Sequence, residues 1–415
     1  MLTLIFVNAY TSTQPGLDDL GNLHMSEELA LAVSQVCQRW RNIALDTPSL
    51  WTNIILLGPL WDFELAKLYL HRSSLHPIDL FILAYPKDYP SFKEIESNVV
   101  EELLVPHLPR CRSIKVVSHN VNTDHSLLCT LFSHSMIIHF PSLERIQIED
   151  NICIPEAHIE GNFSLVSDAP KLWHAILIGH GLIPYIPPLT NVTTLHLAET
   201  ESILDVIHHC PVLETLWVYE TEADWVDDHV PHAHPSLRSL CLFNGVHCVS
   251  QLLLYLIAPN LEELIIAPVA FSNLSLLHSR TDAGTPRFPG LKSLTMSLSP
   301  TDCAATMALA AHCFPNIETL ILPYLYPRHF VEVFSQSIER KVFAELTSLA
   351  VREVDETGEA AISEVILRRK LQGRPLRKIF VDGNSYRKRL LGNLGTEVEI
   401  EERDLWREIE SRRCI

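Results

Sequence analysis

The sequence predicts an α/β protein in which short parallel strands alternate with helices along one array of repeated units. Two observations carry this prediction: the motif Pro-x-Leu-x-x-Leu-x-Leu recurs along the chain, and the segments between its copies have helical apolar spacing. A chain of 415 residues is also too long for one compact core. Its 47% of hydrophobic residues form a core and exclude a disordered chain.

The motif is clearest in six copies, each of which opens with a proline. These copies begin at Pro141, Pro211, Pro235, Pro259, Pro289 and Pro315. Weaker copies span residues 111–116, 172–177, 192–197, 346–351 and 376–381. Successive first leucines are 24 residues apart from Leu213 to Leu237 and 30 apart from Leu261 to Leu291. Leucine-rich repeats run roughly 20 to 29 residues, and their Leu-x-x-Leu-x-Leu core forms a strand.

Stacking explains the pattern, because one short strand cannot bury its apolar face alone and neighbouring copies share a core. Between strands, Leu252, Leu253 and Leu256 show helical spacing, and the proline fits because it cannot continue the preceding helix. We therefore expect an irregular leucine-rich-repeat solenoid with parallel strands on the concave face and helices on the convex face. The alternative, a doubly wound α/β enzyme, is opposed by the absence of any Gly-rich phosphate-loop motif.

Strand alternation predicts which side chains line the concave face, where a protein partner would bind. They are Arg145, Gln147, Trp217, Tyr219, Phe243, Ile265, Ile321 and Phe380. This row is mostly apolar or aromatic, and exposed aromatic side chains are typical anchors of protein interfaces, whereas a phosphate-binding site would need clustered arginines. The alternative is that the C-terminal tail, a loop or packing across the solenoid covers several of these residues.

A second pattern lies upstream of the repeats, in residues 33–51. Its apolar positions share one helical face: Val33, Val36, Cys37, Trp40, Ile43 and Ala44. Thr47 before Pro48 predicts an N-cap followed by a one-turn helix that carries Leu50 and Trp51. These residues resemble the second half of the F-box, the V-C-x-x-W-R-x-I-A-x-x-x-P-x-L-W pattern familiar from mushroom-type fungal F-box proteins. Residues 65–80 resemble the stretch that joins that family's F-box to its leucine-rich repeats.

The resemblance implies a non-catalytic substrate-recognition subunit of a Skp-cullin-F-box type ubiquitin ligase. The F-box would dock on a Skp-family adaptor, and through it on a cullin, while the repeats would bind a protein substrate. The resemblance implies these adaptor-facing or F-box core residues: Leu2, Phe6, Val36, Cys37, Leu50 and Trp51, with Trp40 and Ile43 holding the helices together. The alternative is an interaction scaffold that no longer assembles into a ligase.

One departure from the F-box pattern concerns its start. Residues Met1–Phe6 match only the end of the family's first helix and lack its Leu-Pro-x-Glu opening, so we expect an incomplete first helix. The expected organisation has four parts. They are an F-box-like helical module at 1–54, a linker helix with a first degenerate repeat at 55–110, the solenoid at 111–396, and a charged capping helix at 397–415.

Charge and motifs exclude several other functions. The net charge of -18 opposes binding to nucleic acid or anionic membrane, and no window is apolar enough to span a bilayer. The ten cysteines form no C-x-x-C pair, which predicts free thiols in the cytoplasm or nucleus and no zinc site. The histidines of His229-Val-Pro-His232-Ala-His234 are interpreted as loop residues rather than metal ligands. We expect no catalytic residue, metal or cofactor, and no enzymatic activity.

Overall fold

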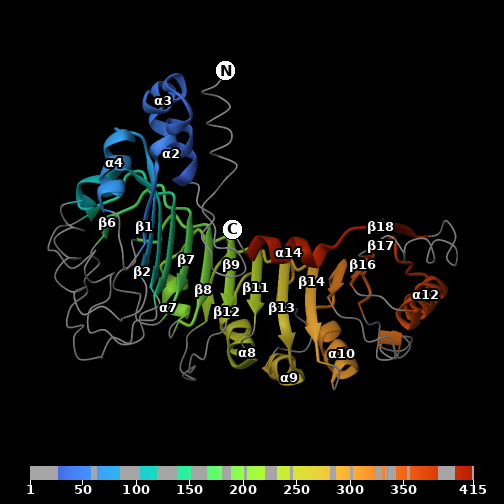
Figure 1. The fold of residues 1–415 in the computed structure, drawn as a ribbon. Helices are drawn as coiled ribbons and strands as arrows, with labels where there is room; N and C mark the ends of the chain where they lie inside the picture. The colour runs from blue at the N-terminus through green and yellow to red at the C-terminus, as the bar shows by residue number, and fades with distance from the viewer. Residues whose placement is uncertain are drawn as a thin grey trace. The chain divides into compact units, whose positions relative to one another are not determined.

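A computed structural model describes most of the chain, which divides into two compact units, Met1–His196 and Leu197–Ile415 (Figure 1). The described residues are 27–57, 63–84, 103–118, 138–150, 166–179, 188–200, 203–219, 231–243, 246–280, 287–299, 302–323, 330–331, 334, 343–352, 356–381 and 398–413. Fourteen strands form one sheet in the order β1-β2-β3-β5-β7-β8-β9-β11-β13-β14-β15-β16-β17-β18. The predicted α/β class, with parallel strands and intervening helices, is therefore confirmed, and the sheet is consistent with a solenoid-like fold.

The first unit begins with helices and continues into strands. Its helical elements are α2 (Glu27–Val36), α3 (Gln38–Leu45), the 3-10 helix η1 (Pro48–Trp51), α4 (Phe63–Arg72) and η2 (Val105–Arg110). Its strands are β1 (Asn53–Leu57), β2 (Ile78–Ala84), β3 (Cys111–Ser118), β4 (Ile138–His139), β5 (Arg145–Asp150), β6 (Val166–Asp168), β7 (His174–Ile178) and the start of β8 (Thr194–Ala198). The sheet thus begins at β1, which overlaps the start of the segment 55–110 in which the sequence predicts a linker helix and the first degenerate repeat.

The second unit alternates strands and helices. Its large-sheet strands are β9 (Thr215–Tyr219), β11 (Ser239–Phe243), β13 (Glu263–Val269), β14 (Ser293–Leu298), β15 (Thr319–Leu322), β16 (Ser348–Val351), β17 (Lys378–Val381) and β18 (Glu399–Glu402). The small strands β10 (His232–Ala233) and β12 (Leu256–Ile257) pair with each other. Its helices are α7 (Ile203–His208), α8 (Val246–Tyr255), α9 (Phe271–Arg280), α10 (Cys303–Cys313), α12 (Glu356–Leu371) and α14 (Leu405–Arg413). The segment predicted as one capping helix therefore contains a strand, β18, before its helix.

Equivalent positions of the motif stand opposite one another in the parallel ladder. In the second unit, Leu240 pairs in register with Leu216 on one side and with Leu264 on the other. The ladder continues from Leu264 to Leu294 and on to Leu320. All of these leucines are buried, so the motif supplies one continuous column of core side chains.

The proline of the motif occupies the second position of a turn rather than simply ending a helix. The N–H of Leu261 donates to the carbonyl of Ala258 at 3.2 Å. In the same way, the N–H groups of Leu213, Leu237 and Leu291 each donate to the carbonyl three residues earlier. Pro259 follows Ala258 directly, where its fixed φ favours the turn. Each proline therefore favours the turn that leads the chain into its strand.

The residue after the proline also connects neighbouring repeats. Asn260 Nδ2 donates to the carbonyl of Pro235 at 2.7 Å, and Ser236 Oγ donates to that of Pro211 at 3.2 Å. Gly290 holds the equivalent position in the next copy, where a Cβ would stand 2.9 Å from the carbonyl oxygen of Pro259. The glycine thus allows a close approach between two backbones that a side chain would prevent.

No helix within the described ranges combines the length and the apolar character that a bilayer span requires.

We predict that Gly290→Ala destabilises the second unit by about 1 to 3 kcal/mol, because the new methyl group meets backbone atoms that cannot turn away. Ser236→Ala removes one exposed hydrogen bond at the equivalent position and should cost less than about 1 kcal/mol. Thermal melts followed by circular dichroism compare the two variants. Equal melting temperatures for Gly290→Ala and wild type would contradict the close packing.

Candidate functional site

The N-terminal helices carry the first group of predicted site residues. Sequence periodicity predicts one continuous helical face, but the structure divides it at Cys37, whose extended backbone (φ -159°, ψ 167°) separates α2 from α3. Arg41 Nε donates across the junction to the carbonyl of Ser34 at 2.9 Å. The break leaves Cys37 exposed and Val36 60% exposed, although both belonged to the predicted apolar stripe.

Trp51 holds this module together. Its fully buried indole donates from Nε1 to the carbonyl of Ala44 at 2.8 Å, which joins η1 to the end of α3. Its ring packs edge-on against Tyr69 of α4, with centroids 5.0 Å apart, and the guanidinium of Arg72 lies 4.2 Å from the indole centroid. One side chain thus connects three helices through a hydrogen bond, an aromatic contact and a cation-π contact.

Thr47 departs from its predicted role. The sequence predicts that its side chain caps the one-turn helix, but no side-chain cap is formed there. Its hydroxyl instead donates back to the carbonyl of Ile43 at 2.6 Å, which ties the turn to α3. Pro48 does open η1 as predicted.

The described F-box residues therefore fall into three groups by burial. Leu50 and Trp51 are fully buried, whereas Trp40 and Ile43 are half-buried and Val36 and Cys37 are exposed. Leu2 and Phe6 lie outside the described residues. Leu45, at the end of α3, is 41% exposed and was not singled out from the sequence, although its place outside the predicted apolar face was the available signal.

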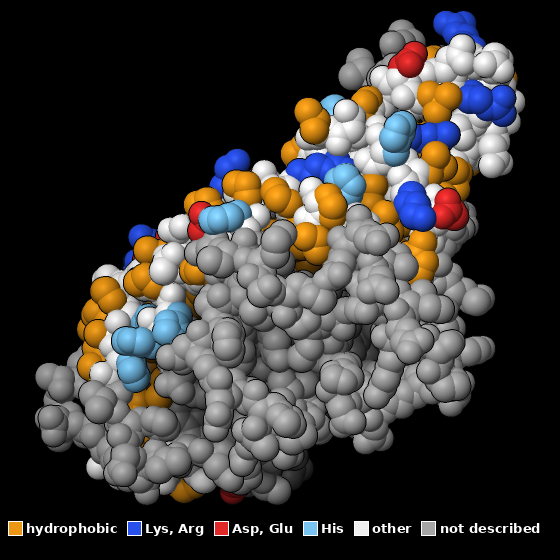
Figure 2. Space-filling view, turned by 90° about the vertical axis from the view of Figure 1, so that its left-hand side faces the viewer, with side chains coloured by type: hydrophobic (Ala, Val, Ile, Leu, Met, Phe, Trp, Pro, Cys, Tyr) orange, Lys and Arg blue, Asp and Glu red, His pale blue; other side chains and the backbone are white. Residues whose placement is uncertain are grey.

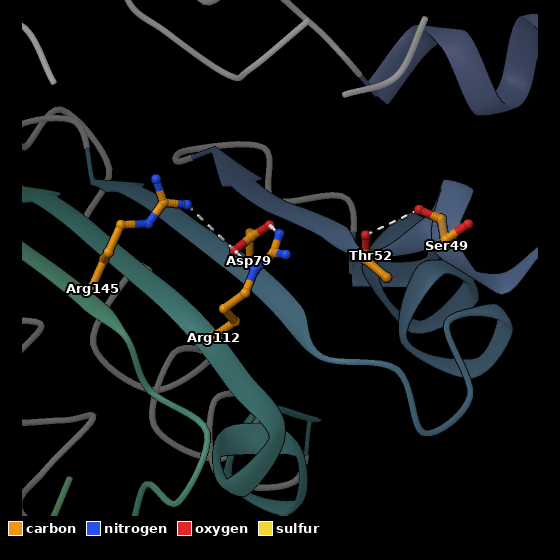
Figure 3. A network of polar contacts seen from close by, with 5 residues as sticks. All are labelled: Ser49, Thr52, Asp79, Arg112 and Arg145. Atoms are coloured by element: carbon orange, nitrogen blue, oxygen red, sulfur yellow. Dashed lines mark hydrogen bonds and ion pairs between the residues drawn. The ribbon is translucent and has the colours of Figure 1, made fainter. Parts of the chain in front are cut away.

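The start of the predicted row in the first unit is a charged network (Figure 3). Asp79 of β2 accepts hydrogen bonds from Arg112 of β3 on both carboxylate oxygens, and Arg145 Nη2 of β5 lies 4.0 Å from Oδ1 of the same carboxylate. Gln147, the other predicted polar position on β5, donates to Glu149. Both β5 side chains are half-buried, and each lies close to an acidic side chain, Asp79 for Arg145 and Glu149 for Gln147.

The aromatic part of the predicted row lies in the second unit. We call Trp217, Tyr219 and Phe243 the aromatic row. Their rings are stacked, with centroids 5.7 Å apart between Trp217 and Phe243 and 5.3 Å apart between Tyr219 and Phe243. The expectation that these side chains are exposed is wrong, since all three are buried and Trp217 is only 2% exposed. Ile265, Ile321 and Phe380 are buried as well.

The C-terminal helix α14 contributes to this burial. Trp406 of α14 lies against Phe243, with ring centroids 6.3 Å apart. In Figure 1, α14 crosses the strands of this unit on the side away from α8, α9 and α10. The structure thus agrees with the alternative that the C-terminal segment covers part of the row.

Two histidines form a buried pair on β7 and β8. The rings of His174 and His196 lie 5.3 Å apart, and Nε2 of His174 has no hydrogen-bond partner. Burial, with a smaller contribution from the nearby Arg145, lowers the pKa of His174 to about 4. Burial, with a smaller contribution from His174, lowers the pKa of His196 to about 3. Both rings are therefore neutral at pH 7.

The histidine motif shows no metal site in the described part of the chain. His232 lies near His208, with ring centroids 5.5 Å apart, while His229 is outside the described residues. Across the described ranges, no group of three or more His, Cys, Asp or Glu side chains is placed to hold a metal ion. Figure 2 shows, over the described part of one face, hydrophobic side chains interspersed with Lys, Arg and His, as is ordinary on protein surfaces.

A family model described as F-box-like matches residues 22–57, which include α2, α3, η1 and β1. No match to a curated protein is found. The F-box resemblance is thus confirmed over these residues, and it indicates a role in substrate recognition by a ubiquitin ligase. Leu2 and Phe6 lie outside the match.

We predict that Trp51→Ala costs about 3 to 5 kcal/mol, because it removes a fully buried aromatic side chain together with its hydrogen bond. Trp40→Ala, at a half-buried position, should cost less. Thermal and urea melts of the full chain measure both. A larger loss for Trp40→Ala than for Trp51→Ala would show that the module is held together differently.

A pH dependence follows from the histidine pair. The pKa of each buried ring lies below the ordinary 6.5, so between these values the unfolded chain binds more protons than the folded one. The free energy of unfolding therefore keeps its full value above about pH 6.5 and should fall, by on the order of 3 kcal/mol for each ring, as the pH drops toward 4. Urea melts across this range test it. His196→Gln should flatten the dependence, and an unchanged slope would rule out the pair as its source.

Proposed function

We propose that this chain is a substrate-recognition subunit of a Skp-cullin-F-box type ubiquitin ligase. The observation that carries the proposal is the F-box-like match over residues 22–57. Within it, Trp51 is committed to the core, while Val36 and Leu45 at the ends of α2 and α3 offer apolar side chains to a partner. In this proposal those exposed side chains contact the Skp-family adaptor, which connects the chain to the cullin.

The remainder of the chain would bind the protein to be ubiquitinated. A run of parallel strands in register supports this role, because stacked repeats form the extended regular surfaces with which proteins of this kind bind partners. In this proposal the repeats are leucine-rich repeats, the module at 1–54 assembles with the ligase, and the array up to residue 396 selects the substrate. The net charge of -18 favours a protein partner over nucleic acid, in the cytoplasm or nucleus. The chain itself performs no chemistry.

A second candidate function is an interaction scaffold that does not assemble into a ligase. The observation that favours it is the mismatch at the start of the F-box pattern, since residues 1–21 lie outside the F-box-like match. The two functions differ in one measurable property, which is binding to a Skp-family adaptor.

We predict that the full chain co-purifies with a Skp-family adaptor and that Val36→Asp weakens this binding at least about tenfold, which corresponds to about 1.4 kcal/mol. The melting temperature should stay unchanged, because Val36 is exposed. Isothermal titration calorimetry with purified adaptor measures the affinity.

The matched control is Leu75→Asp, which places the same charge at a site that is 89% exposed and outside the F-box-like match. It should bind the adaptor like wild type. Failure of the wild-type chain to bind any Skp-family adaptor would favour the scaffold. Equal losses in both variants would rule out the proposed surface.

A further inference from the structure

In the second unit, helix α14 packs against the face of the sheet that is predicted to bind a partner. We propose that the aromatic row is a docking site for an amphipathic helix of a partner protein, and that α14 of the same chain occupies this site in the free protein. The inference shares one premise with the proposed function, namely that this face of the sheet binds a protein partner. The partner is defined by chemistry: a helix with a large aromatic residue followed three positions later by a branched aliphatic one.

The contact between α14 and the aromatic row defines that chemistry. Trp406 is 8% exposed and lies at a 57° tilt against Phe243, whose ring is stacked on Trp217 and Tyr219. Ile409 is also buried and follows Trp406 by three residues, so both project from one side of the helix. Helices that bind grooves are recognised through anchors with this spacing.

The first turn of α14 makes a second contact, near the ends of β15 and β16. Asp404 caps the helix by accepting from the N–H of Arg407 at 2.9 Å, and the same carboxylate lies 3.6 Å from Nε of Arg352. A small, partly open pocket of about 10 Å³, near the smallest volume that holds one water, is lined here by Trp406 and Ile321 among other residues.

α14 is held by different interactions from the strand that precedes it. β18 is fixed to β17 by a parallel backbone ladder from Lys378–Glu399 to Val381–Glu402. α14 meets the sheet through the ring of Trp406 against Phe243, and Asp404, directly before the helix, lies near Arg352 in a partly exposed ion pair. A helix of nine residues is marginal in water by itself, so undocking would melt it. A partner helix with equivalent anchors can therefore replace α14 without opening the sheet.

The test uses the full chain with α14 released by the double substitution Trp406→Ala and Ile409→Ala. The probe is a fluorescent peptide that copies residues 403–413, and its binding is followed by anisotropy. We expect the released variant to bind this peptide at least tenfold more tightly than wild type, whose site is filled. A peptide carrying Trp406→Ala should not bind. Trp173→Ala, which removes a half-exposed tryptophan elsewhere, is the matched control and should behave like wild type.

Three outcomes would overturn the inference. The first is a folded double variant that binds the peptide no better than wild type. The second, which needs no variant, is equal hydrogen-exchange protection of α14 and β11 in wild type, since a displaceable helix must exchange faster. The third is a wild-type dimer that exchanges α14 between copies, which would make a second copy the occupant. None of these measurements involves the adaptor, so loss of adaptor binding in the same proteins would count against the proposed function alone.

Discussion

The hydrogen bond on which the sheet depends joins the residue before each strand to the preceding repeat. The N–H of Glu262 donates to the carbonyl of Arg238 at 2.8 Å, and that of Lys292 donates to the carbonyl of Glu262 at 3.0 Å. Each carbonyl is thereby fixed by the next copy of the motif, so every repeat sets the register of its neighbour. In-register leucine columns, the proline turns and the close approach at Gly290 all require this alignment.

Buried arginines secure the places where helices and turns return to the sheet. Arg110 Nη2 donates to the carbonyl of Leu70 at 3.0 Å, and Arg369 donates to the carbonyls of Phe343 and Leu346 at 3.2 and 2.8 Å. Burial is the main reason that the pKa of Arg369 falls to about 10, with Arg374 adding to it, yet the group stays charged at pH 7. These arginines thus add side-chain hydrogen bonds to backbone oxygens at the end of α4 and in the turn before β16.

The two candidate surfaces use aromatic side chains in different ways. In the helical module, Trp51 is internal and connects three elements, which leaves the exposed side chains of Val36 and Leu45 for a partner. In the second unit, the rings of the aromatic row stack on one another, and Trp406 covers part of the row. The same residue type therefore stabilises a fold in one place and forms a site that a helix occupies in the other.

The sequence by itself determined the repeat, the parallel α/β class and the F-box-like segment, because all three depend on local spacing that survives in a linear pattern. It also identified the residues of the aromatic row. Only the tertiary structure decided their burial, the break at Cys37 and the use of Trp51 rather than Trp40 as the anchor. These features depend on what lies opposite a side chain in space. Trp406 stands 163 residues beyond Phe243 (406 minus 243), and no periodicity connects positions so far apart.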